Sequence, residues 1–277
     1  LRRLIVKPMR YLKVKPAPHL APFVECYFIW EKHALLTAPL RIESPPAGFA
    51  SMVFTYGDPY QVRTYNGSFT APAAFLTGQA TRQYELELSG RIGMVGIVFR
   101  PAGLSTLFGL PMYEFTDERI SLADVLGPSA TYLHEQLGNC LTAEARMALL
   151  EPFLNRQLLR QGNCFDRTDF AANLIVDKFG VLTVSELMND LYVCRRQFER
   201  QFLQKVGVSP KYYARIRRVS HLCAQLATQR WQITDWQDFV FRAGYYDQSH
   251  FIREFTQFTG KKPTLYIKAN TELSQYL

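Results

Sequence analysis

The chain has 277 residues, of which 48% are hydrophobic, so one or two packed domains are expected. No run of about 18 apolar residues is present, so no membrane-spanning helix is predicted. Residues 1–15 lack the apolar stretch and the cleavage site of a secretory signal, so no such signal is predicted. The five cysteines form no C-x-x-C pair, so the sequence predicts no zinc site, no disulfide framework and a cytoplasmic location with free thiols.

The first part of the chain is predicted to be rich in β-strands. Residues 84–88 read Tyr, Glu, Leu, Glu, Leu, which is the period-two alternation of a half-buried strand. Other apolar or β-branched runs are short and are separated by Pro and Gly, a pattern that favours a barrel or a sandwich. The predicted strands are Cys26–Trp30, Ser51–Tyr56, Tyr84–Leu88 and Ile92–Phe99, and short helices are predicted at Gly103–Phe108 and Ser121–Leu126.

Leucines recur at helical spacing between Leu133 and Leu158. Thr142 is positioned to cap a helix that starts near Ala143, and Pro152 is expected to kink or break that helix. The Gln161-Gly162-Asn163 stretch reads as a linker. Two interpretations of the leucines stay open, namely the core of a helical bundle and a surface for a homodimer.

The second half is predicted to be helical, with clear start and stop signals. The expected helices and their signals are Thr168–Phe179 before Gly180; a helix from the Thr183/Glu186 capping box to about Leu191; Cys194–Val206 before Gly207; Ser209-Pro210 to about Ala227; a helix from the Thr234/Gln237 capping box that ends before Gly244; Asp247 to Phe258 before Gly260; and a last helix near Pro263.

The pattern Phe-x-Arg-x-Phe-x-x-x-x-Gly-x-x-Pro-x-x-Tyr occurs twice, starting at Phe198 and at Phe251. A repeat of this size indicates one supersecondary unit used twice. Residues 1–159 hold 15 Lys or Arg and 13 Asp or Glu, whereas residues 160–277 hold 17 and 11. The repeat therefore lies in the basic half of the chain, as a surface that binds nucleic acid phosphates requires.

Each repeat is predicted to form a helix-turn-helix, whose second helix enters the major groove of double-stranded DNA. The helix from Pro210 to Ala227 would span roughly 27 Å and would hold two such reading helices about one duplex turn apart. The Phe pairs at i and i+4 are expected to be core. The predicted DNA-reading residues are Arg195, Arg196, Glu199, Arg200, Gln248, Ser249, His250 and Arg253, and the predicted phosphate contacts are Lys211, Arg215, Lys261 and Lys262.

Simpler roles are open for several of these side chains. Arg200 and Arg253 recur within the repeat, so either one could form a salt bridge within its own bundle. Glu199 fits a solvated helix face as well as it fits a base contact. His250 fits a packing or phosphate role as well as it fits base readout.

The segment from Thr168 to Lys268 resembles the AraC/XylS family of bacterial transcriptional regulators. The resemblance rests mainly on residues 207–215, GVSPKYYAR, and residues 244–255, GYYDQSHFIREF. It implies two helix-turn-helix units joined by a long helix. The chain departs from the family at Met188 and Val240, where a small Ala is usual, and at Cys194, which replaces the usual Ser cap.

The first half is similar to the cupin-like N-terminal domain of such regulators. The similarity lies in residues 45–54, 75–78, 96–101 and 107–111, and it implies a β-barrel that senses a ligand or mediates dimerisation. We therefore expect a multidomain α+β chain with a cupin-like domain over 1–127, a helical linker over 128–165 and an AraC-type DNA-binding domain over 166–277. The expected partners are double-stranded DNA, a small-molecule effector, a second copy of the chain and RNA polymerase.

No catalytic residue, metal site or cofactor is predicted. The histidines include no His-x-His pair, and the chain has no Gly-x-Ser-x-Gly elbow or phosphate-binding Gly-rich loop. One enzymatic alternative is DNA repair by methyl transfer to cysteine, which would need a four-Cys zinc module that the Cys spacing does not supply. Another alternative is an interaction module or a DNA binder without sequence readout.

Overall fold

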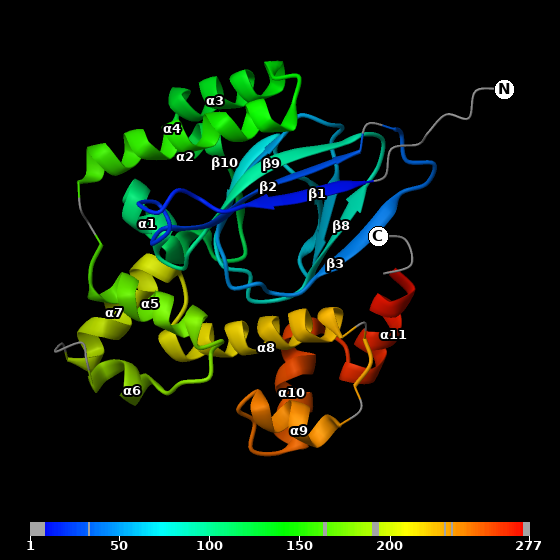
Figure 1. The fold of residues 1–277 in the computed structure, drawn as a ribbon, viewed down its shortest axis with the longest axis vertical. Coiled ribbons are helices and arrows are strands. Elements are labelled where there is room, and N and C mark those ends of the chain that lie inside the picture. The colour runs from blue at the N-terminus through cyan, green and yellow to red at the C-terminus, as the bar shows by residue number, and fades with distance from the viewer. Residues whose placement is uncertain are drawn as a thin grey trace.

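The structure is a computed structural model that describes residues 9–32, 34–162, 165–189, 194–229, 231–233 and 235–273. Figure 1 shows a strand-rich N-terminal domain above a helical C-terminal domain, with the long helix α8 lying between them. The N-terminal domain carries ten strands in two antiparallel sheets. The strands are β1 (Arg10–Val14), β2 (Val24–Lys32), β3 (Leu40–Ser44), β4 (Ser51–Thr55), β5 (Gln61–Thr64), β6 (Gly67–Thr70), β7 (Ala74–Thr77), β8 (Tyr84–Leu88), β9 (Ile92–Phe99) and β10 (Arg119–Ser121).

The larger sheet has the order β1-β2-β9-β4-β7-β10, and the smaller one has the order β3-β8-β5-β6. A core that includes Phe28, Val53 and Phe75 from the larger sheet and Val62 and Leu88 from the smaller one lies between them. This is the double-sheet arrangement of cupin-like folds. Among the described strands, backbone hydrogen bonds join each sheet separately and do not close the two sheets into one ring.

The other face of the larger sheet is covered by helices. These are α1 (Gly103–Phe108), the 3-10 helix η1 (Met112–Phe115), α2 (Leu122–Leu126), α3 (Pro128–Asn139) and α4 (Ala143–Gln161). Leu133 and Leu137 of α3 and Leu150 and Leu154 of α4 are buried in one core with residues of β2, β4 and β9. Packing within one chain therefore accounts for these leucines, whereas Leu141 remains 94% exposed.

Three sequence predictions in this domain need correction. Four predicted strands correspond to β2, β4, β8 and β9, but the other six strands were not predicted, because they are short and most lack a clear alternation. The predicted helix over 121–126 starts at Leu122, after a strand that ends at Ser121. Helix α4 continues through Pro152 to Gln161, so the proline does not break it.

The C-terminal domain contains α5 (Arg167–Asp177), α6 (Val184–Asn189), α7 (Arg195–Val206), α8 (Pro210–Thr228), α9 (Trp236–Arg242), α10 (Gln248–Thr259) and α11 (Pro263–Leu273). The capping residues explain most of these limits. Ser209 accepts a hydrogen bond from the Tyr212 amide, and Asp247 accepts one from the His250 amide. Gly207 and Gly260 end α7 and α10 with φ of 96° and 69°, the left-handed region that favours glycine.

Two helix starts differ from the sequence prediction. Helix α5 begins one residue earlier than predicted because Asp166 and Asp169 form a reciprocal capping box. Helix α9 is capped by Asp235, whose carboxylate accepts from the amides of Gln237 and Asp238. The predicted cap Thr234, the predicted helix end Leu191, and Asn163 in the linker lie outside the described residues.

Candidate DNA-binding surface

Helix α7 separates a buried aromatic face from an exposed basic face. Phe198 and Phe202 are 1% and 0% exposed and pack with Tyr213 of α8, as the sequence predicted for the Phe pair. Arg196 and Arg200 are exposed. The exposed guanidinium groups are thus available to bases or phosphates, because the opposite face of the same helix anchors it in the core.

At the start of α7, Arg195 binds Glu199 one turn away. The Arg195 Nε lies 2.8 Å from the Glu199 Oε1, and both side chains are largely exposed. Cys194 precedes the helix and makes no side-chain capping hydrogen bond, as its replacement of Ser predicts. An exposed pair of this kind contributes little to stability.

Helix α10 repeats the arrangement of α7. Phe251 and Phe255 are 2% and 0% exposed, whereas Gln248, Ser249 and Arg253 are exposed. His250 is half-buried, and its ring stands edge-on to the Tyr245 ring at 5.2 Å between centroids. Helix α10 therefore exposes the polar side chains Gln248 and Ser249 at its start and the cation Arg253 one turn later.

Helix α8 is the physical link between the two units. Its 19 residues span roughly 28 Å at about 1.5 Å per residue. Tyr213 and Ala214 belong to the core of the first unit, and Ile216, Val219 and Leu222 belong to the core of the second unit. Because one rigid helix contributes to both cores, it fixes the position of α7 relative to α10.

Glu254 is a buried carboxylate that the sequence interpretation did not assign. Its side chain is 2% exposed, and its oxygens accept hydrogen bonds from Arg215 Nε at 2.6 Å and from the Tyr245 hydroxyl at 2.8 Å. Together with burial, Glu254 raises the pKa of Tyr245, with burial as the larger cause. The sequence distinguishes Glu254 only by a difference between the repeats, since the corresponding position in the first repeat is Gln201.

The four predicted phosphate contacts occupy different environments. Lys211 and Lys262 are exposed. Arg215 binds Glu254 and also donates to the Gln257 side chain at 2.6 Å. Lys261 binds across the domain boundary, with its Nζ 2.5 and 2.7 Å from the two oxygens of Glu43. In this conformation, Lys211 and Lys262 are thus the more accessible of the four.

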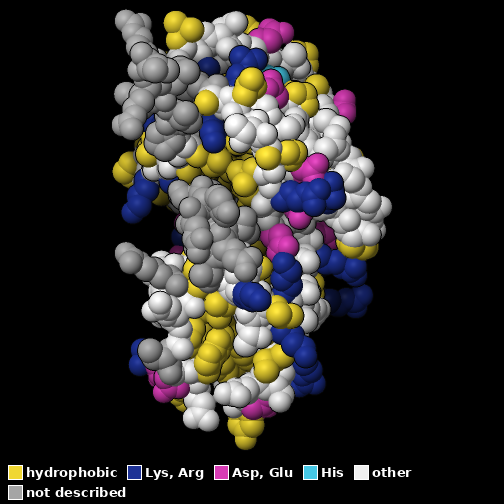
Figure 2. Space-filling model, turned by 90° about the vertical axis from the view of Figure 1, so that its right-hand side faces the viewer, with side chains coloured by type: hydrophobic (Ala, Val, Ile, Leu, Met, Phe, Trp, Pro, Cys, Tyr) yellow, Lys and Arg dark blue, Asp and Glu magenta, His cyan; other side chains and the backbone are white. Residues whose placement is uncertain are grey.

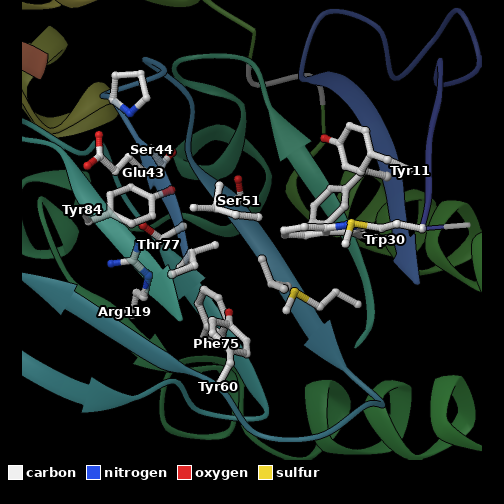
Figure 3. Close-up of a pocket in the computed structure, with 17 residues that line it drawn as sticks. Tyr11, Trp30, Glu43, Ser44, Ser51, Tyr60, Phe75, Thr77, Tyr84 and Arg119 are labelled. Carbon is white, nitrogen blue, oxygen red and sulfur yellow. The ribbon is translucent and has the colours of Figure 1, made fainter. Parts of the chain in front are cut away.

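A cavity of about 540 Å³ lies between the two sheets of the N-terminal domain. Its lining is mainly aromatic and aliphatic, and Figure 3 shows Tyr11 and Trp30 at one end and Tyr84 and Arg119 at the other. The Arg119 guanidinium carbon lies 4.1 Å from the centre of the Tyr84 ring. Tyr11 as a whole is 55% exposed, and desolvation at its hydroxyl raises the pKa of that group to about 12. A mainly apolar space with few charged groups, here Arg119 and Glu43, is typical of a site for a small molecule.

The wall of this cavity is in direct contact with the C-terminal domain. Glu43 of β3 lines the cavity and holds Lys261. A few residues later, the carbonyl of Gly48 accepts a hydrogen bond from the buried hydroxyl of Tyr213 at 2.6 Å. Arg217 of α8 donates to the Ala47 carbonyl and lies over the Phe49 ring. The segment 43–49 therefore connects the cavity to the helix that links the two helix-turn-helix units.

In the described part of the chain, no three His, Cys, Asp or Glu side chains are grouped so that they could hold a metal ion. None of the described helices is both long enough and apolar enough to cross a membrane.

Two family models match the sequence. Residues 12–121 match a domain of unknown function (DUF6597), and residues 187–269 match a helix-turn-helix domain. The latter range covers α7, α8, α9 and α10, so it coincides with the paired units described above. Among curated proteins, no relative matches the sequence.

Several solved structures are similar to the chain. ToxT from Vibrio cholerae is 11% identical, with a TM-score of 0.45 over 94% of this chain and 98% of that one. ToxT bound to an unsaturated fatty acid is 13% identical, with a TM-score of 0.46 over 87% and 94%. The AraC-like transcriptional activator CuxR is 15% identical, with a TM-score of 0.28 over 78% and 94%.

Proposed function

We propose that the chain is a DNA-binding transcription regulator that reads two adjacent major grooves with α7 and α10, which lie within its match to a helix-turn-helix domain. One observation carries this proposal. Both helices bury a Phe pair and expose polar or basic side chains, and a single helix, α8, enters the cores of both units. Reading helices held one duplex turn apart suit two blocks of sequence on one face of DNA.

The proposed base-reading residues are those with exposed side chains on the two helices. Arg196 and Arg200 suit guanine, because a guanidinium can bond its O6 and N7 together, and Gln248 suits adenine. Arg253 and Ser249 extend the second reading surface. Lys211 and Lys262 are proposed to bind phosphates, which would fix the register without reading sequence.

The cavity between the sheets is the proposed effector site. Its apolar lining and the Arg119 cation suit an apolar molecule with an anionic group. Because Glu43 lines the cavity and holds Lys261, an occupant that moves β3 would change the contact between the domains. An effector acts only through a difference in affinity between the two domain arrangements. We also propose a second copy of the chain and RNA polymerase as partners, because a role in transcription regulation suggests both.

The test is selection of bound duplexes from a random pool at a stated salt concentration of about 0.15 M. We expect two constant blocks with centres about 10–10.5 bp apart. The double variant Arg196→Ala, Arg200→Ala should relax the sequence at one block, and Gln248→Ala should relax it at the other, each by about 1–3 kcal/mol. Recovery of no motif, with binding that falls steeply as salt rises, would instead indicate electrostatic attraction alone.

A further inference from the structure

A recess of about 560 Å³ opens between the two helix-turn-helix units. Residues of α6 and α7 from the first unit, of α8, and of α10 from the second unit line it. Figure 1 shows α8 running from the α6–α7 pair to the α9–α10 pair, and five residues of α8 line the recess. It is built jointly by the two units and does not belong to either reading helix alone.

Basic side chains dominate the polar lining of this recess. Lys211, Arg215 and Arg218 come from successive turns of α8, at the i, i+4 and i+7 positions that share one helix face. Arg195 is the first residue of α7. The N-terminal ends of α7 and α8 both contribute to the lining, and their dipoles add positive potential there.

The acidic group in the lining is already neutralised. Glu254 is buried, lies 2.6 Å from Arg215 Nε, and accepts from the Tyr245 hydroxyl. It therefore holds Arg215 in place at the base of the recess and does not repel an incoming anion as a free carboxylate would.

Arg218 is held in position but keeps unused capacity to donate hydrogen bonds. Its Nη2 donates to the Gly180 carbonyl at 3.3 Å, and its Nη1 lies 3.9 Å from Glu254 Oε1. Its Nε is buried without a hydrogen-bond partner among the described atoms. The Arg218 side chain is 16% exposed, and an oxyanion seated in the recess would supply acceptors for the accessible edge of this guanidinium.

The proposed function determines which anion meets this surface. If α7 and α10 enter adjacent major grooves on one face of DNA, the minor groove between them faces α8, bordered by phosphates on both sides. We propose that the recess holds backbone phosphates at this central minor groove, with Lys211 and Arg218 as their main partners. This inference rests on the paired reading of DNA and adds a third anchoring point, shared by both units.

The test replaces single phosphates of the selected operator by uncharged methylphosphonates, one position at a time, and measures affinity for the full-length protein. We expect the largest loss, about tenfold, at one or two phosphates between the blocks, which corresponds to about 1.4 kcal/mol. Lys211 is exposed, so Lys211→Met should not affect folding. In this variant the same methylphosphonate should reduce DNA affinity clearly less, because the lysine that binds the phosphate is already missing.

Lys13→Met is the matched control, since it removes the same charge from an exposed lysine of β1 in the other domain. It should keep the full sensitivity to the central methylphosphonates. Arg218→Lys retains the positive charge, and the same methylphosphonate replacements in this variant measure the coupling between Arg218 and the central phosphates. Two results would overturn this inference while leaving the paired reading intact. One is selection of two specific blocks whose central phosphates can be replaced without loss of affinity. The other is an equal loss of affinity on that replacement in Lys211→Met and in Lys13→Met. Failure to select any sequence would reject the paired reading together with it.

Discussion

Tyr213 of α8 donates a hydrogen bond to the carbonyl oxygen of Gly48 at 2.6 Å, and the two residues lie 165 positions apart in sequence. The tyrosine is fully buried in the core of the first helix-turn-helix unit, and Gly48 belongs to the segment that leaves the cavity wall. This buried hydrogen bond is one of several polar contacts that join the DNA-binding domain to the N-terminal domain, together with Arg217 to the Ala47 carbonyl and Lys261 to Glu43.

Tyr213→Phe should lower the free energy of unfolding by about 1–3 kcal/mol, because the Gly48 carbonyl would stay buried without its donor. Guanidinium chloride unfolding of the full chain measures this loss. Tyr246→Phe is the matched control, since Tyr246 is 96% exposed and its change should stay within about 0.5 kcal/mol. Equal midpoints for the two variants would show that the interdomain hydrogen bond contributes nothing.

Glu43→Gln should release Lys261 from its contact with the N-terminal domain. The freed ammonium group could then reach a DNA phosphate, so we expect DNA affinity to rise by about three- to tenfold and the salt dependence to steepen by about one phosphate contact. Titration of labelled operator at several salt concentrations measures both quantities.

Glu87→Gln is the control for Glu43→Gln, because it makes the same change in charge on β8. Glu87 binds Arg41 at 2.9 Å and Arg63 at 2.6 Å, all within the smaller sheet. If both variants bind DNA with the same increased affinity, the increase comes from the change in net charge. The Glu43–Lys261 contact then does not keep Lys261 from DNA.

The limits of the reading helices could be predicted because their signals are local. Gly207, Ser209-Pro210 and Gly260 act through their own backbone or through the next turn, so the printed sequence contains the whole cause. Figure 2 shows Lys and Arg side chains along one edge of the lower half, where the C-terminal domain lies, beside a stripe of hydrophobic side chains. This agrees with the net charge of the second half of the chain.

The contacts between domains could not be predicted in the same way. Glu43 and Lys261 are 218 positions apart, and no periodicity in either segment points to the other. The strands β5 and β6 were missed for a related reason, since β6 is exposed throughout and presents no alternating pattern. Their pairing with each other and with β8 holds them in the sheet, and such tertiary context overrides weak local propensity.

Stability should fall on mild acidification through His221 of α8. Its ring stacks on Phe179 at 4.0 Å, and burial, with a smaller contribution from the charge of Arg217, lowers its pKa below the ordinary 6.5. Between that lowered pKa and 6.5, the unfolded chain binds more protons than the folded chain, so this part of the stability is present above pH 6.5 and is lost as the pH falls.

The comparison of wild type with His221→Gln isolates this contribution. The free energy of unfolding, measured from pH 7.5 to pH 5, should decline less steeply in the variant, because Gln does not titrate. His221→Phe keeps the aromatic stack and should show the same shallow decline. Parallel curves for all three proteins would exclude His221 as a source of the pH dependence.

The cavity between the sheets can be tested with a fluorescent aromatic sulfonate, anilinonaphthalene sulfonate, as the probe. Its apolar rings match the lining near Phe28 and Trp30, and its anionic group matches Arg119. We expect saturable binding to the folded protein, with about tenfold weaker affinity in Arg119→Met, which corresponds to about 1.4 kcal/mol for the lost charge.

A variant with a filled cavity shows whether the probe binds in the cavity or elsewhere on the surface. Ser51 of β4 lines the cavity, and Ser51→Phe places a ring inside it, at a cost of about 1–3 kcal/mol if the walls must move. This variant should lose the probe while still unfolding cooperatively. Arg91→Met removes a largely exposed cation paired with Asp58 and should bind the probe as wild type does. If Arg119→Met and Arg91→Met bind it equally well, Arg119 does not hold the anionic group, and the proposed effector class loses its support.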